Sequence, residues 1–356
     1  MLHQLSGLRQ VVTTPGAVEA LLAAPAVSVP YGPRSEELGL GAFPLALDGD
    51  AHREASDLVA ASLAATARAH RAGVTAAAQV TRRRLRDATS RIDVVGGLVD
   101  PALGAWVEEW YGLSGRATDL RRTGRLILHA TFLNPTVPSH PVDETALWRA
   151  VTWLERCRPG LAAAVGAAPE GTLAADLLAR TGEPDLTVDL LLGLTVGPLA
   201  LGSWALAHVV DELLATSWVL DSIDSDVAAR EVYAEALARR PPLPGVLRDV
   251  RGRTVLRVDG RDLAVPRGRV LAATACARFS PEDRPGRAAG LVFGAGSHAC
   301  LGRAQVTEVS GVVLEALGRR SPRRVPGPAG RLTPGAGPTG VAHWPFPGRL
   351  QVSLLR

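Results

Sequence analysis

The chain has 356 residues, of which 47% are hydrophobic, so it can bury a sizeable core as one large domain or two ordinary ones, and extensive disorder is excluded. Its 39 basic residues are all arginine and are scattered along the sequence, and 35 acidic residues leave a net charge of only +4. This balance predicts no nucleic-acid-binding patch.

The cysteines and the apolar runs predict where the protein resides. Cys157, Cys276 and Cys300 lie far apart in the sequence, which argues against a disulfide framework and for a reducing compartment. No secretory signal opens the chain, and its longest apolar stretch, 190–210, contains Gly, Pro, Ser and His. We therefore expect a cytoplasmic protein without a membrane segment, with Cys157 and Cys276 as small core residues.

The first 154 residues predict one short strand and then mostly helices. Val11 and Val12 suit a strand, and 15–22 suits an amphipathic helix that starts at a proline. The segment 30–48 is interrupted by Pro and Gly and predicts a loop, after which a helix begins near Asp48. From 58 to 154 the pattern is helix after helix, and the expected aromatic core residues are Trp106, Trp110, Trp148 and Trp153.

A long apolar helix is predicted from Asp185 to Leu220, with Pro184 at its start. Pro198 in its middle lacks a backbone N–H, so we expect a kink there with a freed carbonyl group. Thr195 and Ser203 lie about one turn away on either side. Ser203 is equally compatible with a mere packing role, together with the neighbouring glycines.

The remaining elements are shorter. A helix is predicted over 225–240, a hairpin over 255–265 around the turn Asp259-Gly260, a strand over 270–275 and a last strand over 350–354. An irregular segment, 278–290, precedes the third cysteine, and 341–345 forms a C-terminal loop. Most of the predicted elements are therefore helices, with a few short strands.

Ten residues, 293–302, place Cys300 where a glycine turn leads into a helix. Gly294 and Gly296 permit positive φ and close backbone approach. A helix predicted from Leu301 would put Cys300 at its N-terminus, where N–H groups and the helix dipole lower the thiol pKa. One cysteine and one histidine are too few for a zinc site, and a single thiolate suits haem iron better. The alternative is a buried structural cysteine.

This stretch resembles the haem-binding loop of cytochromes P450, whose pattern is Phe-x-x-Gly-x-His-x-Cys-x-Gly-x-x-x-Ala. Five positions match, and the last one holds Val306, with Ala304 nearby. The resemblance spans roughly residue 11 to the end. It implies a P450-like fold, mainly α with small β-sheets, in which 1–356 is a single domain. It also implies haem b bound through Cys300, the metal ligand. The matching positions are Phe293, Gly296, His298, Cys300 and Gly302.

The resemblance also implies which residues contact haem. His52 occupies the histidine of a His-x-x-x-Arg pair on a propionate, but Ser56 stands at the arginine position, with Arg53 a possible substitute; His52 could instead be a surface histidine. Arg248 matches the arginine on the second propionate, where His298 would act with it. Phe293 would pack against the thiolate side of the porphyrin. The expected cofactor-binding residues are His52, Arg248, Phe293, Gly294, His298, Cys300 and Gly302.

Two family signatures are incomplete. Aligned on Gly197, the acid and alcohols that relay protons in the family fall at Leu199, Ala200 and Leu201, so this relay is absent. The catalytic residues therefore stay unassigned within the distal stretch 197–201, which includes Pro198. In the family's Glu-x-x-Arg pair, Glu235 fits but Ala238 holds the arginine position, so Arg239 or Arg240 must bend back to it, or Glu235 is solvated.

The resemblance implies oxidative tailoring of a small organic molecule in secondary metabolism, with electrons from a separate ferredoxin-type partner. Because the relay is lost, a second interpretation is a haem-dependent peroxygenase, isomerase, dehydratase or lyase. A third is a P450-like auxiliary protein that supports a partner enzyme. Such helpers tend to lack the cysteine loop, which this chain keeps.

Overall fold

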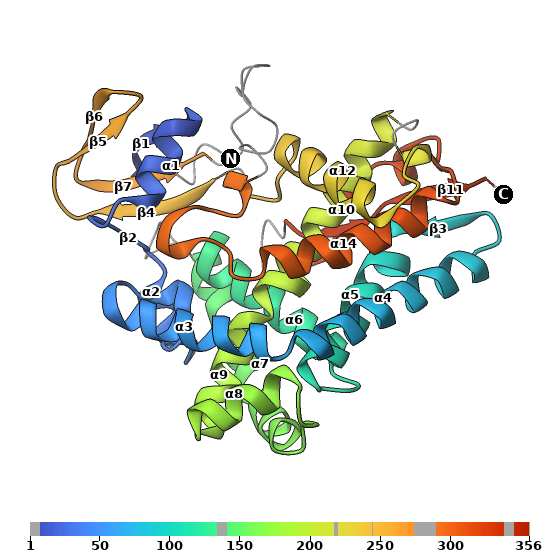
Figure 1. The fold of residues 1–356 in the computed structure, drawn as a ribbon, viewed down its shortest axis with the longest axis horizontal. Helices are drawn as coiled ribbons and strands as arrows, with labels where there is room; N and C mark the ends of the chain where they lie inside the picture. The colour runs from blue at the N-terminus through green and yellow to red at the C-terminus, as the bar shows by residue number, and fades with distance from the viewer. Residues whose placement is uncertain are drawn as a thin grey trace.

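The computed structural model describes residues 8–133, 141–216, 220–243, 245–273, 290–337 and 345–355, and the chain is mainly helical with small sheets, as predicted (Figure 1). The main helices are α1 (Pro15–Ala23), α2 (Gly32–Glu37), α3 (Gly49–Ala65), α4 (Ala67–Asp87), α5 (Asp100–Tyr111), α6 (Ala117–Ile127), α7 (Pro141–Gly166), α8 (Leu173–Thr181), α9 (Pro184–Leu194), α10 (Gly202–Leu213), α12 (Asp226–Arg239) and α14 (Arg303–Gly318). The predicted loop 30–48 therefore contains a short α-helix, α2, and a 3-10 turn over Pro44–Ala46.

The described residues form four small sheets at the margins of the helices. The largest has the strand order β1-β7-β4-β2, with β1 parallel to β7 and the other pairs antiparallel. The predicted hairpin is formed by β5 and β6, and both turn residues, Asp259 and Gly260, have positive φ. The strands are β1 (Leu8–Val12), β2 (Val27–Ser28), β3 (Arg91–Asp93), β4 (Val246–Val250), β5 (Thr254–Val258), β6 (Arg261–Val265), β7 (Gly268–Ala272), β8 (Pro322–Arg324), β9 (Thr333–Pro334), β10 (Pro347–Arg349) and β11 (Gln351–Leu354).

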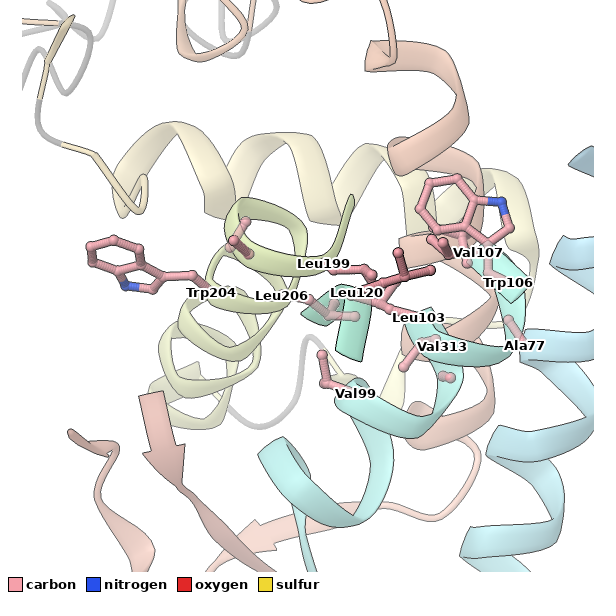
Figure 2. Close-up of a cluster of buried hydrophobic side chains, with 14 of the residues drawn as sticks. Ala77, Val99, Leu103, Trp106, Val107, Leu120, Leu199, Trp204, Leu206 and Val313 are labelled. Carbon is pink, nitrogen blue, oxygen red and sulfur yellow. The ribbon is translucent and has the colours of Figure 1, made fainter. Parts of the chain in front are cut away.

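The main core is built from α4, α5, the central helix and α14. Figure 2 shows side chains from these elements converging, among them Leu103, Trp106, Leu199 and Leu206. Trp106 and Trp110 are buried, as predicted. The prediction for Trp148 is wrong, because its side chain is 62% exposed on α7. Trp153 is half-buried and donates its indole N–H to Thr123 Oγ1 at 2.9 Å.

The central helix runs from Pro184 to Leu213 through α9, the π-helical segment η5 (Val196–Leu201) and α10. It ends earlier than predicted, since a 3-10 turn replaces it from Leu214 to Thr216. By length and composition alone this helix could cross a membrane, since its most apolar window has a mean hydropathy of 1.7. However, 78% of that window is buried inside the protein. Its apolar character is therefore that of a core helix.

The carboxylate that arginines brace at the end of this helix is Asp211 rather than Glu235. Glu235 pairs with Arg239 at 2.9 Å on the surface, so one of the expected alternatives holds. Asp211 is buried and is bonded by Arg240 and, at 2.6 Å, by Arg324 of β8. One arginine follows the end of α12 and the other lies on β8, so these ion pairs to a buried carboxylate tie the central helix to both segments.

The two cysteines outside the glycine loop are both predicted to be small core residues. Cys157 is only half-buried on α7, and its S–H lies 3.5 Å from the carbonyl oxygen of Leu154. Cys276, most of the irregular segment 278–290 and nearly all of the loop 341–345 lie outside the described residues. What the sequence indicates for these positions stays a prediction.

Candidate functional site

The loop before α14 has the predicted glycine geometry. Gly294 and Gly296 have φ of 77° and 70°, values that favour glycine. A Cβ on Gly296 would lie 2.6 Å from the carbonyl oxygen of Leu22, at the end of α1. The loop is closed by a hydrogen bond from the N–H of Cys300 to the carbonyl of Phe293, at 2.8 Å. Backbone packing against α1 and this bond together fix where Cys300 lies.

Cys300 differs from the prediction in two respects. The helix α14 begins at Arg303 with Gly302 as its N-cap, so Cys300 precedes the helix instead of starting it. The residue as a whole is exposed, but protein atoms surround its thiol, and this desolvation raises the pKa of the thiol. The N–H of Gly302 and the charge of Arg303 lower the pKa, as expected of a helix start, but the desolvation outweighs them.

His298, which is part of this loop, lies in a cluster of polar groups. Its Nε2 is 3.5 Å from Asp48 Oδ1, and its ring lies 3.8 Å, centre to centre, from that of His52. Burial lowers the pKa of His298 to about 4, and the nearby His52 and Arg248 lower it further. Its Nδ1 is buried and has no hydrogen-bond partner within the described part of the chain. Such an atom is rare in a folded protein unless a missing group satisfies it.

His52 is buried, so its interpretation as a surface histidine is wrong. Its Nδ1 lies 2.9 Å from the carbonyl oxygen of Pro44, and its Nε2 lies 3.0 Å from that of Ser297. Ser56, at the position of the missing arginine, contacts the same Nε2 at 3.2 Å. His52 therefore supports the cysteine loop from α3. Arg53 is 68% exposed and pairs with Asp50 at the surface, away from this cluster.

Arg248 is a buried cation on β4. Only 5% of it is exposed, and burial lowers the pKa of its guanidinium group. Its one side-chain hydrogen bond given by the structure runs from Nη1 to the neighbouring carbonyl of Leu247, at 2.8 Å. Within the described ranges no carboxylate lies at ion-pair distance from it. Since a buried unpaired charge is costly, an anionic group beside Arg248 would stabilise the protein.

The central helix opens at Gly197. This residue is exposed although its neighbours Val196, Leu199 and Ala200 are buried in the core. A Cβ built on Gly197 would meet no atom within 4 Å. Pro198 and Leu201 are half-buried. Of the distal stretch predicted from sequence, Gly197, Pro198 and Leu201 thus border open space, while Leu199 and Ala200 do not.

At Pro198, where a kink is predicted, the chain forms a π-helical segment. The backbone carbonyl group that Pro198 leaves without a helical partner accepts a hydrogen bond from another helix. In a regular helix, the N–H at position 198 would bond to the carbonyl of Leu194. Pro198 has no N–H, and the hydroxyl of Tyr111 on α5 donates to that carbonyl instead, at 3.1 Å. Tyr111 is fully buried, and burial raises its pKa, so the hydroxyl keeps its proton. No local pattern in the sequence indicates this partner, 83 residues away.

We expect Tyr111→Phe to destabilise the protein by about 1–3 kcal/mol, because it leaves the buried carbonyl of Leu194 without a donor. In the Pro198→Ala background the new N–H restores the helical bond, so the same substitution should cost clearly less. Urea denaturation of the four proteins of this double-mutant cycle measures the difference. Equal costs in both backgrounds would contradict the role given to Tyr111.

Ser203, whose role the sequence left open, belongs to a buried polar cluster and not to the opening. Its hydroxyl donates to Asp100 Oδ1 at 2.7 Å, and Arg125 of α6 bonds the same carboxylate at 3.0 Å. Thr195 is likewise committed, since its hydroxyl donates to the carbonyl of Leu192 at 2.6 Å. Neither hydroxyl is available to deliver a proton at Gly197.

A second polar cluster joins α14 to α4 and α5. The indole N–H of Trp106 donates to His70 Nδ1 at 3.1 Å, which leaves the proton of His70 on Nε2, 3.0 Å from the carboxylate of Glu308. These contacts fix the helix that follows Cys300 against the core. Their partners lie 36 and 238 positions apart in sequence, so no local signal predicts them.

The site residues fit a haem group. The cysteine loop offers one free thiol, the central helix offers an open glycine, and Arg248 and His298 offer a buried cation and an unsatisfied buried nitrogen. This donor set suits a flat apolar cofactor with one thiolate ligand and anionic substituents. The central helix lies next to α14 at Gly202. A Cβ built on this glycine would lie 3.4 Å from Val306 Cγ2 of α14.

The element order, the central helix and the cysteine loop define a cytochrome P450 fold, and solved bacterial P450 structures share it over 97% of this chain. The chain is similar to CYP154A1 from Streptomyces coelicolor A3(2), with 22% identity, 97% of this chain and 91% of that chain covered, and a TM-score of 0.73.

Two further structures show the same likeness. The first, P450BioI in complex with an acyl carrier protein that carries hexadec-9Z-enoic acid, has 15% identity, 97% and 92% coverage and a TM-score of 0.74. The second, from work on unusual P450-like monooxygenases of microbial secondary metabolism, has 18% identity, 96% and 92% coverage and a TM-score of 0.74. No family model and no curated protein matches the sequence.

Proposed function

We propose that this chain is a haem-thiolate protein that binds haem b through Cys300 and carries out oxidative tailoring of a small organic molecule. The observation that carries the proposal is the buried guanidinium group of Arg248, which has no carboxylate partner in the described chain. Its charge acts on His298, which lies on the same loop as Cys300. A structural cysteine would need neither an anion-binding cluster nor an opening in the central helix. The P450 fold supports the same conclusion.

In this proposal each residue has one task. Cys300 Sγ would be the iron ligand, Arg248 and His298 would bind the propionates, and Phe293 would pack on the thiolate side of the ring. Once bound, the haem iron supplies the redox chemistry of oxygen activation. His52, already engaged with Pro44 and Ser297, positions the loop, so we assign it no direct propionate bond. The electron donor would be a separate ferredoxin-type protein, in the cytoplasm.

Proton delivery distinguishes this chain from a standard monooxygenase site. Leu199 and Ala200 are buried in the core, and the hydroxyls of Thr195 and Ser203 are bonded elsewhere. The residues of the central helix that border the opening at Gly197 therefore carry no proton donor. We infer that the substrate, or water that it orders, supplies the proton.

The same observation favours a second function, a haem-dependent peroxygenase, isomerase, dehydratase or lyase. Such reactions bypass the stepwise delivery of electrons and protons that the missing relay serves. Conversion of a candidate substrate without any reductant separates this function from the first. A chain that takes up no haem would instead be an auxiliary protein of a partner enzyme.

We expect Arg248→Ala to weaken haem retention by roughly ten- to a hundredfold without abolishing binding, since a hydrogen bond to a charged group contributes about 1.5–3 kcal/mol. The measurement is the rate of haem transfer from the holoprotein to apomyoglobin. Arg257→Ala, an exposed arginine on β5, is the matched control and should leave the rate unchanged. Unchanged retention in Arg248→Ala would refute the propionate assignment.

A further inference from the structure

A groove of about 330 Å³ lies between the C-terminal parts of α4 and α14. Leu85 and Ala316, both buried, form its apolar floor, and four arginines and one glutamate surround them. A second hollow, of about 420 Å³, continues along the exposed side of α4 and shares Arg82 and Arg86 with the first. The arginines that line the two hollows are Arg82, Arg83, Arg86, Arg319 and Arg320. We call this surface the arginine groove.

The arginine groove carries positive charge that the protein does not neutralise. Within the described ranges no carboxylate lies at ion-pair distance from Arg82 or Arg83, and Arg86 reaches only exposed Asp87, at 3.9 Å. Glu315 is already paired with Arg319 at 2.7 Å. Arginines in other parts of the surface have close carboxylate partners, such as Arg269 with Asp249 at 2.8 Å. Two short arginine runs of the sequence, 82–86 and 319–320, therefore meet at this groove.

Helix capping accounts for only part of this charge. Arg320 donates to the carbonyl of Leu85, and Arg84 and Arg86 lie in the last turn of α4, where cations stabilise the negative end of the helix dipole. Arg82 and Arg83 precede that turn and have neither role. Both side chains are exposed, and neither has an ion-pair partner within the described chain.

The arginine groove is remote from Cys300. The helix α14 has 16 residues, so its two ends lie about 24 Å apart at 1.5 Å per residue. Cys300 precedes its first residue, and the residues that line the groove lie at its other end. A helix seated in the groove would therefore lie too far from Cys300 to take part in the reaction.

We propose that the arginine groove binds an acidic amphipathic helix of a partner protein. An apolar floor between two helices suits the apolar stripe of a third helix, and arginines on the rims suit the carboxylates that flank such a stripe. The apolar floor and Glu315 disfavour a nucleic-acid backbone, which would need a continuous row of cations. This site goes beyond the proposed haem chemistry and would anchor the protein to another one.

The test uses the full chain and a labelled helical peptide with leucines at i, i+4 spacing flanked by glutamates. Fluorescence anisotropy should show saturable binding that weakens as salt is added, and a peptide with glutamine in place of glutamate should not bind. The double variant Arg82→Glu, Arg86→Glu should bind the peptide at least about tenfold more weakly, because both positions are reversed in charge.

The matched control is Arg253→Glu, Arg257→Glu, which makes the same change in net charge on exposed residues of the β5 region. It should change the affinity less than about twofold, and circular dichroism should show both variants folded. Absence of peptide binding, or equal weakening by both double variants, would overturn the proposal. Tighter binding of a DNA duplex or of anionic lipid vesicles than of the peptide, lost in the groove variant, would also overturn it.

Discussion

Cys300→Ala is expected to abolish the thiolate signature in the reduced-CO difference spectrum of the haem-loaded protein. Cys300 lies on a loop that the Cys300–Phe293 hydrogen bond and the packing of Gly296 on α1 hold in place. No other cysteine of the described chain lies in that loop. Loss of this one sulfur therefore removes the thiolate ligand that the described site offers.

Two control variants sharpen this experiment. Cys157→Ala, a half-buried cysteine on α7, should keep the full signature. Cys300→Ala should keep part of its haem, because Arg248 and His298 are unchanged, so that uptake and ligation are measured separately. A wild-type protein that stays colourless after expression with ample haem would refute the haem-thiolate proposal. It would instead support the role of an auxiliary protein for a partner enzyme.

Nearly complete diversion of electrons to hydrogen peroxide is expected when a surrogate ferredoxin and its reductase are supplied without the true substrate. The reason is the lack of proton donors among the described helix residues at Gly197. Reduced oxygen is released as hydrogen peroxide unless a further proton arrives first and allows the O–O bond to break. The measurement is the ratio of peroxide formed to NADPH consumed. A substrate with its own hydroxyl, amine or carboxylate should lower this ratio, and an analogue without that group should bind but not lower it.

Leu201→Thr tests the same idea within the protein. Position 201 is half-buried beside the opening, whereas Ala200 is fully buried, so a hydroxyl at 200 would enter the core. Leu201→Thr should reduce peroxide release with the poor analogue, and Leu201→Val, which has nearly the same shape without the hydroxyl, should not. Efficient coupling of a purely apolar substrate by the unmodified protein would show a proton route that the described residues do not reveal. Turnover with neither reductant nor peroxide would support the isomerase or lyase function.

The sequence by itself determined the class of fold and the position of the candidate metal ligand. The glycines, histidine and cysteine of 293–302 act within one short loop, so their spacing carries the geometry directly. The amphipathic patterns likewise place most helices and the β5–β6 hairpin within a few residues, because helix and strand periods are local properties. Local patterns were less informative about burial, as Trp148 shows.

The tertiary structure alone decided what surrounds these local elements. Tyr111 replaces the missing N–H of Pro198 from 83 residues away, and Asp211 receives Arg324 from 113 residues away. The pKa of Cys300 is raised because desolvation, which depends on every packed neighbour, outweighs the local effect of Gly302 and Arg303. Hydrogen bonds, ion pairs and desolvation act through space between segments whose approach no short stretch of sequence encodes, and so only the folded chain reveals them.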